Sequence, residues 1–252
     1  NWGADLTILE EGTEFLERFR AVLSGGVATL PMMTSCSPGW IQFIEHNYPE
    51  HLENLSTCKS PHQMFGAVVK SYYAKKLGKK PEDMYVVSIM PCTAKKAENQ
   101  LDSVKPYVDV VLTFEELQAL FDSKDIDLTT LEEDVLDNAS YYGRIFARSG
   151  GLSDAVKEGL KEQNLDFEVK PCACDGIEEC RMALLKKSRN ALDANFIEGM
   201  ACIGGCIGGA GCLTHGEKNK AEVDKYGMEA YEKTISEAVS VLMPVARRTD
   251  ME

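Results

Sequence analysis

The sequence lacks several features that would assign it to particular classes of protein. No apolar run approaches the roughly 18 residues that a helix needs to cross a bilayer, so we expect no membrane segment. Positive charge is scarce: 27 Lys and Arg stand against 40 Asp and Glu, for a formal net charge of −13. This balance argues against nucleic-acid binding, which needs a basic surface. Internal repeats and low-complexity segments are also missing, and the 44% hydrophobic content is typical of a folded globular protein.

The nine cysteines do not suggest a disulfide framework. Their number is odd, the chain is long, and no secretory signal opens it. We therefore expect reduced thiols, metal ligation and a cytoplasmic location. The first residue is Asn1 rather than Met, so we also expect a segment trimmed from a longer chain.

Short apolar runs alternate with helical patterns, which indicates an α/β fold. We predict a single domain, residues 1–252, with two lobes, approximately 1–105 and 106–252. Each lobe would have a parallel sheet flanked by helices. The expected strands are 84–90 (a buried strand), 108–112, 167–170 and 195–197. The expected helices are 7–23, 60–77, one capped by Thr113 with Glu116, 177–191 and 229–246.

Three segments place cysteine beside proline or glycine near the end of a regular element: TSCSPGW around Cys36, MPCTAKKAE around Cys92, and EGMACIGGCIGGAGC around Cys202 and Cys206. Cys92 directly follows an expected strand, and ligands of α/β folds bind beyond the carboxyl ends of strands. The spacing of four between Cys202 and Cys206 would put both thiols on one face of a helical turn. The surrounding glycines let the backbone approach a bulky group.

Four thiolates around a gap favour zinc or an iron–sulfur cube. Zinc ribbons use paired C-x2-C hooks, which this sequence lacks, so we favour iron–sulfur. Lys95 and Lys96 follow Cys92, and a lysine aimed into a closed site would stabilise an anionic ligand. A solvated helix start is the alternative for this pair.

Taken together and in this order, the three segments resemble the signature motifs of the active-site (H-cluster) domain of iron-only ([FeFe]) hydrogenases. The resemblance runs from Asn1 to about Gly211 and includes ADLTILEEGTEFLER and NYPEHLENLSTCKSP. It implies a [4Fe–4S] cube bridged to a two-iron centre that carries CO, cyanide and a dithiolate amine, bound in the cleft between the lobes. It also implies reversible interconversion of protons and electrons with hydrogen, with electrons exchanged with a ferredoxin-like carrier or electron-transfer domains.

The resemblance assigns roles to individual residues. Cys92, Cys202 and Cys206 match cube ligands, with Cys206 as the bridge. Lys95 matches the lysine that holds a cyanide. The residues expected around the two irons are Met90, Pro91, Met200 and His62, the last standing where a glutamine is common.

A proton path is also implied. The family has a cysteine near the distal iron followed by Glu, Ser and Glu towards the surface. By motif register, Glu14, Ser56 and Glu11 match these last three. Proton reduction in a dry pocket requires such a chain of hydrogen-bonded groups.

The first motif departs from the family, which usually has two adjacent cysteines where this chain has Cys36 and Ser37. By register, Cys36 falls on the proton-relay position and Ser37 on a cube-ligand position, although a serine alkoxide is a poorer iron ligand than a thiolate. In one interpretation Cys36 ligates the cube and Ser37 lies near the two-iron centre. In the other, the fourth cube position is Ser37 or open. We favour Cys36 as the ligand, because the cube would otherwise lack a fourth thiolate.

Two further hypotheses compete with a catalytic hydrogenase. One is a hydrogen sensor with the same cofactor, slow turnover and a signalling partner. The other is a non-catalytic iron–sulfur carrier similar to the eukaryotic hydrogenase-like assembly factors, which lack the two-iron centre. A segment that binds no cofactor on its own is a third possibility. The glutamates, Met90 and Lys95 fit the hydrogenase hypothesis better.

Overall fold

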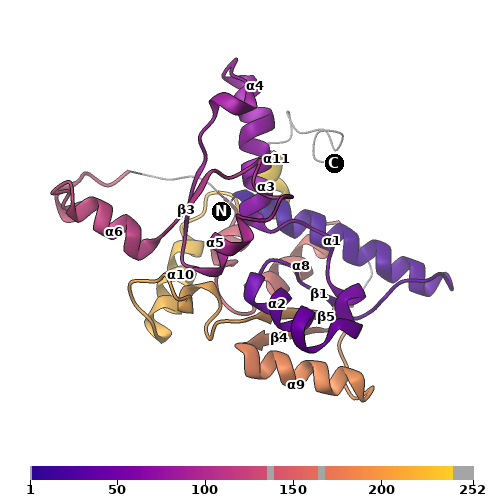
Figure 1. The fold of residues 1–252 in the computed structure, drawn as a ribbon. Coiled ribbons are helices and arrows are strands. Elements are labelled where there is room, and N and C mark those ends of the chain that lie inside the picture. The colour runs from indigo at the N-terminus through magenta and orange to yellow at the C-terminus, as the bar shows by residue number, and fades with distance from the viewer. Residues whose placement is uncertain (1, 135–138, 164–167, 241–252) are drawn as a thin grey trace.

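A computed structural model describes residues 2–134, 139–163 and 168–240 of the 252-residue chain. Within these ranges two parallel sheets are flanked by helices (Figure 1). The α/β class with parallel sheets is therefore confirmed. No helix in the described ranges has both the length and the apolar character that a bilayer crossing needs.

The larger sheet has three parallel strands in the order β1–β5–β4. They span Met32–Met33, Phe196–Met200 and Pro171–Asp175. Neighbouring residues of each strand face opposite sides, so Met32 and Phe196 enter one hydrophobic cluster while Met33 and Ile197 enter the other. The sheet is thus the middle layer between two groups of helices.

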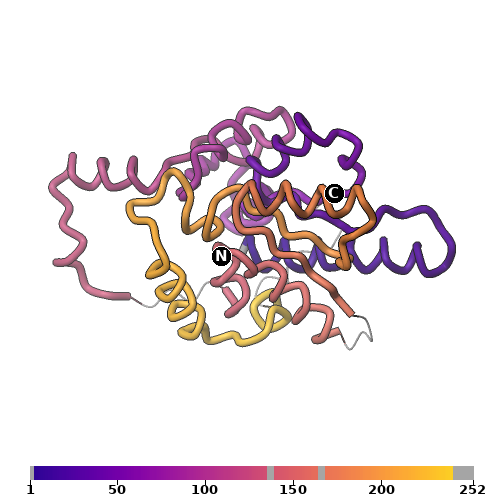
Figure 2. The backbone as a smooth tube through the Cα atoms, turned by 90° about the horizontal axis from the view of Figure 1, so that it is seen from below, coloured from indigo at the N-terminus to yellow at the C-terminus, as the bar shows by residue number. Residues whose placement is uncertain are grey.

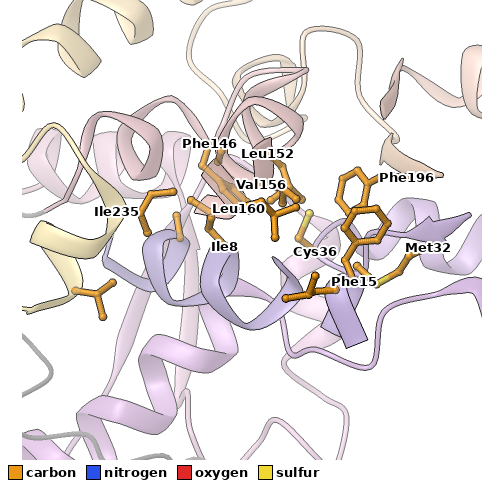
Figure 3. Packing of buried hydrophobic residues seen from close by; sticks show 14 residues of the cluster. Ile8, Phe15, Met32, Cys36, Phe146, Leu152, Val156, Leu160, Phe196 and Ile235 are labelled. Carbon is orange, nitrogen blue, oxygen red and sulfur yellow. The ribbon is translucent and has the colours of Figure 1, made fainter. Parts of the chain in front are cut away.

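On one face, α1 (Trp2–Leu23) and α8 (Gly151–Glu162) cover the sheet, and α11 (Ile235–Ser240) packs against both helices. Figure 3 shows Ile8 and Phe15 of α1 directed at this cluster, and the rings of Phe15 and Phe196 meet edge to face at 5.2 Å. Each such side chain contributes about 1.5–3 kcal/mol through burial. Cys36 lies at the same cluster (Figure 3), so this core positions the first motif.

On the other face, α2 (Pro38–Asn47) and α9 (Ile177–Ser188) cover the sheet. Trp40 of α2 is fully buried, and a Cβ at Gly199 would stand 2.2 Å from its ring. Only glycine therefore lets α2 approach β5 this closely. This contact fixes the start of α2, and with it Ser37, beside the third motif.

The smaller sheet pairs β2 (Val87–Met90) in parallel with β3 (Val110–Thr113). The expectation that β2 is buried was wrong, because Val87 and Ile89 are 46% and 44% exposed. An apolar run does not reveal how much of a strand its neighbours cover, and here all four β2 residues line a cavity. The division into lobes near residue 105 stays a prediction. Residue 105 lies between β2 and β3, which pair in one sheet, and the other sheet pairs β1 with the distant β5.

The remaining helices are shorter. The helix expected from Ser60 is present as α3 (Pro61–Val68), a π-helical turn (Val69–Tyr73) and α4 (Ala74–Lys76). The Thr113–Glu116 capping box is confirmed at α6 (Phe114–Asp122), which projects from the body in both views (Figures 1 and 2). The other elements are α5 (Ala94–Glu98), α7 (Tyr141–Ile145), α10 (Glu217–Met228) and 3₁₀ turns at Pro49–Asn54, Pro81–Asp83, Leu128–Thr130 and Cys206–Gly208.

Several element boundaries differ from expectation, among them those of β4 and α11. The strand expected at 167–170 is β4, shifted to Pro171–Asp175, because proline tolerates the first position of a strand; residue 167 lies outside the described ranges. The helix expected from 229 begins only at Ile235. Just before its start, the amides of Lys233 and Thr234 donate hydrogen bonds to the Glu237 carboxylate. Residues 241–246 of that prediction are also outside the described ranges.

Candidate metal centre

The second and third cysteine motifs follow the carboxyl ends of strands from the two different sheets. β2 ends at Met90, directly before Pro91 and Cys92, and β5 ends at Met200, two residues before Cys202. Met90 and Met200 both line a cavity of about 940 Å³. The structure therefore brings these two motifs to one place, as the positions of their strands predicted.

Glycine turns, rather than a helix, make Cys202 and Cys206 converge. Gly204 and Gly205 have φ of +84° and +80°, and the amide of Gly205 donates to the Cys202 carbonyl at 3.1 Å. Cys206 then opens a 3₁₀ turn. The expected helical turn carrying both thiols was wrong, because only these left-handed glycines reverse the chain tightly enough.

The loop that follows lies against the second motif. The Gly211 amide donates to the Pro91 carbonyl at 3.0 Å, and a Cβ at Gly209 would stand 2.2 Å from that same oxygen. These contacts place Cys206 and Cys212 next to Cys92. The glycines are required here because the two backbones touch.

Four thiols influence one another at this point. Burial raises the pKa of Cys206 to about 12, Lys95 opposes the rise, and the thiols of Cys92, Cys202 and Cys212 add to it. Burial likewise raises the pKa of Cys202, and Cys92 adds to the rise. A group of uncharged, partly buried thiols is a binding site for soft metal centres once the thiols lose their protons.

The donor set fits a multi-iron group. Among the described residues, no three His, Cys, Asp or Glu side chains lie close enough together to hold one metal ion. Iron–sulfur cubes instead take one thiolate at each iron, so their cysteines stand apart around the cluster. Cys92, Cys202 and Cys212 lie near enough to Cys206 to raise the pKa of its thiol, and they supply donors of this kind.

Cys36 and Ser37 reach the same cavity from the first motif. Both line it, and the Lys95 ammonium donates to the Cys36 carbonyl at 3.1 Å. The pKa of Cys36 is raised well above its usual value. Burial is the largest cause, the charge of Glu11 is the second, and Cys206 is the third. Ser37 precedes α2 and makes no side-chain cap bond to it. Cys36 therefore stands between Glu11 and the third motif.

Glu11 is the inner carboxylate and Glu14 the outer one, the reverse of the expected order. Glu11 is fully buried, its Oε1 accepts from the Ser35 amide at 3.2 Å, and burial raises its pKa to about 7. Glu14 lies one helical turn further along α1 and accepts from Ser56 Oγ at 2.6 Å and from Arg18 at 2.6 Å. Motif register identifies these residues on α1, but it does not say which is deeper.

Ser35 and Cys58 lie between the two glutamates, and sequence reasoning missed both. Ser35 Oγ contacts Glu11 Oε1 at 3.4 Å and donates to the Cys58 carbonyl at 2.7 Å. The Cys58 amide in turn donates to Ser56 Oγ at 3.1 Å. Buried groups thus connect the inner carboxylate to the outer one.

The two glutamates have opposite pKa shifts. Burial acts to raise the pKa of Glu14, but the hydrogen bond from Ser56 and the charge of Arg18 bring it below its usual value. For Glu11 burial prevails. Near neutral pH the inner acid is therefore about half protonated, whereas the outer one is ionised.

Lys95 belongs to a buried polar group that also contains His62. The Lys95 ammonium pairs with Glu98 Oε2 at 2.6 Å, and His62 Nδ1 lies 3.6 Å from the same oxygen. Burial acts to raise the pKa of Glu98, but the contacts with His62 and Lys95 lower it to about 2. Both His62 ring nitrogens lack a hydrogen-bond partner among the described residues, and His62 lines the cavity. Lys95 and His62 therefore present donors to any group bound there.

The chain is similar to known proteins both in sequence and in structure. The profile of the family "Iron only hydrogenase large subunit, C-terminal domain" matches residues 1–210. The NADP-reducing hydrogenase subunit HndD of Solidesulfovibrio fructosivorans is 37% identical, over 85% of this chain and 43% of that protein. The cytosolic Fe-S cluster assembly factor narfl of Danio rerio is 28% identical, over 82% and 60%.

A solved [FeFe]-hydrogenase, described with an H cluster that has a 2Fe subcluster, has the same fold. It superposes with a TM-score of 0.76 and 27% identity, covering 95% of this chain and 77% of that one. The chain spans about half the length of the curated relatives it matches.

Proposed function

This chain belongs to the family of the iron-only hydrogenase large subunit, C-terminal domain, and we propose that it carries a site for the reversible conversion of protons and electrons into hydrogen. The carrying observation is the position of Cys36. It lies between Cys206, which follows β5 and lines the same cavity, and the buried carboxyl of Glu11. Cys36 thereby links a candidate metal ligand at the cavity to a buried proton donor.

The residues present fit a [4Fe–4S] cube bridged to a two-iron subcluster. Cys92, Cys202 and Cys206 would hold the cube, and Cys206, which lines the cavity, would be the bridge. When bound, this group supplies the irons at which protons and electrons combine to form hydrogen. Met90 and Met200 line the cavity with apolar side chains that exclude water, and Lys95 presents its ammonium group to anionic ligands.

Protons are handled by the chain itself. Ser56 Oγ and Glu14 exchange protons near the surface, where the Cys58 thiol lies 3.5 Å from Glu14 Oε2. In the interior, Ser35 Oγ lies 3.4 Å from Glu11 Oε1. Glu11, with a pKa of about 7, is poised to take up and release a proton near neutral pH. Cys36 is the next ionisable group towards the cavity, so its thiol passes the proton on.

We further propose a ferredoxin-like electron carrier as the partner and a cytoplasmic location. The acidic charge of −13 supports docking through local patches rather than a nucleic-acid role. The relative named as a subunit of an NADP-reducing hydrogenase supports function beside electron-transfer partners.

Infrared spectroscopy after cofactor maturation tests the proposal. Bands in the region of iron-bound CO and cyanide are expected, and Met200→Ala is expected to shift them because Met200 lines the cavity. A matched control is Met182→Ala, on the exposed surface of α9, which should leave the bands unchanged. Absence of all bands from a protein that has passed through maturation would contradict the proposal.

A second candidate is a non-catalytic iron–sulfur protein. The serine at position 37 and the match to an Fe-S cluster assembly factor favour it. It predicts an iron–sulfur cube without CO or cyanide bands. A hydrogen sensor would instead show the bands together with slow turnover.

A further inference from the structure

The first motif leaves the cube one thiol short. Cys92, Cys202 and Cys206 supply three thiolates, and Ser37 falls on the fourth position by register. Cys36 alone cannot serve both as a ligand and as the proton relay. We propose, on the basis of the proposed function, that Cys212 is the fourth thiolate ligand of the cube in place of Ser37, which leaves Cys36 free for the proton path.

Backbone contacts fix Cys212 beside the other ligand segments. Its amide donates to the Gly209 carbonyl at 3.1 Å, and its Sγ lies 3.5 Å from the Cys206 carbonyl oxygen. The preceding Gly211 donates to Pro91, next to Cys92. Cys212 is therefore attached both to the third motif, to which it belongs in sequence, and to the second motif.

The ends of β2 and β3 hold this loop in place. The Gly211 carbonyl accepts from the Phe114 amide at 3.1 Å, at the start of α6. A Cβ at Gly211 would stand 2.9 Å from the Thr113 side chain and 3.2 Å from the Pro91 carbonyl carbon. The residue before Cys212 is thus clamped between the residues that follow both strands, which is where ligands of α/β folds bind.

Cys212 also has the surroundings of a ligand. It is 6% exposed and lines the same cavity as Cys206. Burial raises the pKa of its thiol, the Gly209 amide opposes the rise, and the thiols of Cys202 and Cys92 add to it. Three cysteines of the proposed cube are thus its neighbours.

Cys36 has different neighbours. It packs at the cluster that contains Ile8, Phe15 and Leu152 (Figure 3). Cys206 is the one thiol among the principal groups that shift the pKa of Cys36. The charge of Glu11 has a larger effect on this pKa, second to burial. This environment suits a proton relay between Glu11 and the cavity. The cube needs a fourth thiolate, which is why the sequence favoured Cys36 as a ligand, and Cys212 supplies it instead.

The binding step needs no additional reactant. The Cys212 thiol releases its proton to solvent as metal binds, and the thiolate donates an electron pair to one iron with no change of oxidation state. Thiolate is a softer donor than the alkoxide of serine, so iron prefers Cys212 to Ser37 when both are within reach.

Anaerobic reconstitution with ferrous iron and sulfide, without maturation of the two-iron centre, tests the proposal. Cys212→Ala is expected to lose the electron paramagnetic resonance (EPR) signal of the reduced cube and at least about one of the four irons per chain. Ser37→Ala and Cys36→Ala should keep both. Cys172→Ala is a matched thiol control, because the Cys172 thiol neighbours Cys174 rather than the cavity.

A second variant guards against misfolding. Cys212→Ser keeps the size of the side chain, so a ligand role predicts shifted g values from an oxygen-bound iron. In the Cys212→Ala background, Ser37→Cys should restore the cube signal by supplying a thiol at the register position. Wild-type iron content and g values in both Cys212 variants would overturn the proposal, as would loss of the cube in Ser37→Ala alone.

This test is separate from that of the proposed function. A cube that depends on Cys212, in a protein that never shows CO or cyanide bands, would contradict the hydrogenase proposal and support this one. CO and cyanide bands in a protein whose cube does not depend on Cys212 would support the hydrogenase proposal and contradict this one. A wild-type protein that takes up no iron would overturn both.

Discussion

Cys36 lies between two groups of side chains that are positioned in different ways. The thiol side consists of Cys92, Cys202, Cys206 and Cys212, and it is placed by backbone contacts between loops that follow strands. The carboxylate side consists of Glu11, Ser35, Ser56 and Glu14, and it is linked mostly by side-chain hydrogen bonds from one helix to two loops. A rigid metal centre needs fixed ligand positions, whereas proton transfer needs groups that can change protonation and reorient.

The largest expected difference between the sides is in metal content. Cys206→Ala removes the thiol that meets Cys92, Cys202 and Cys212, so we expect loss of nearly all iron after reconstitution. Glu11→Gln removes a group from the carboxylate side and should leave the iron content unchanged. Iron and sulfide assays measure both. Equal losses in the two variants would show that the sides are not separate.

A smaller effect concerns stability and pH. The pKa of Glu11 is raised from 4.5 to about 7, so between these values the folded state binds a proton that the unfolded chain has lost. Stability contributed by the protonated carboxyl is complete below about pH 4.5 and is lost as pH rises to about 7. At about 1.4 kcal/mol for each pH unit, the loss is about 3 kcal/mol.

Urea denaturation of the wild type and Glu11→Gln at about pH 5 and about pH 8 measures this loss. The glutamine variant should lack that part of the pH dependence. Glu10→Gln, on the partly exposed neighbouring position of α1, is the control and should follow the wild type. A Glu11→Gln profile parallel to the wild type would contradict burial of an ionisable group at this position.

The smallest expected effect is at the outer end of the carboxylate side. Arg18 bonds Glu14 at 2.6 Å and the Leu55 carbonyl at 2.7 Å, and both ion-pair side chains are 15% exposed. A double-mutant cycle with Arg18→Gln and Glu14→Gln should give a coupling of about 1 kcal/mol in the free energy of unfolding. A coupling of zero would mean that Arg18 does not hold Glu14 in place.

The sequence predicted the thiol side better than the carboxylate side. Cys92 follows a strand, and strand ends of parallel sheets converge, so its meeting with the third motif could be expected. Cys212 could not, because its position depends on the contact between Gly211 and Pro91, two loops far apart in the chain.

Depth within the molecule was the other property that sequence pattern did not reveal. Glu11 and Glu14 are one turn apart on the same helix, and the packing around α1, including the contact of Ser35 with Glu11, decides which of them is buried. For the same reason the apolar β2 strand was expected to be buried although half of it is exposed. Strand β4 was misplaced because PCACD contains few residues with a strong strand preference.

The most direct test of separate metal and proton sides uses the Glu11→Gln variant after cofactor maturation. Isotope exchange between hydrogen and heavy water and the EPR spectrum of the cube are measured on the same sample. Removing a positioned acid–base group should slow exchange at least about 100-fold. The EPR signal should equal that of the wild type, because Glu11 is not among the principal groups that shift the pKa of Cys206. Wild-type exchange, or loss of the cube signal, would contradict the account.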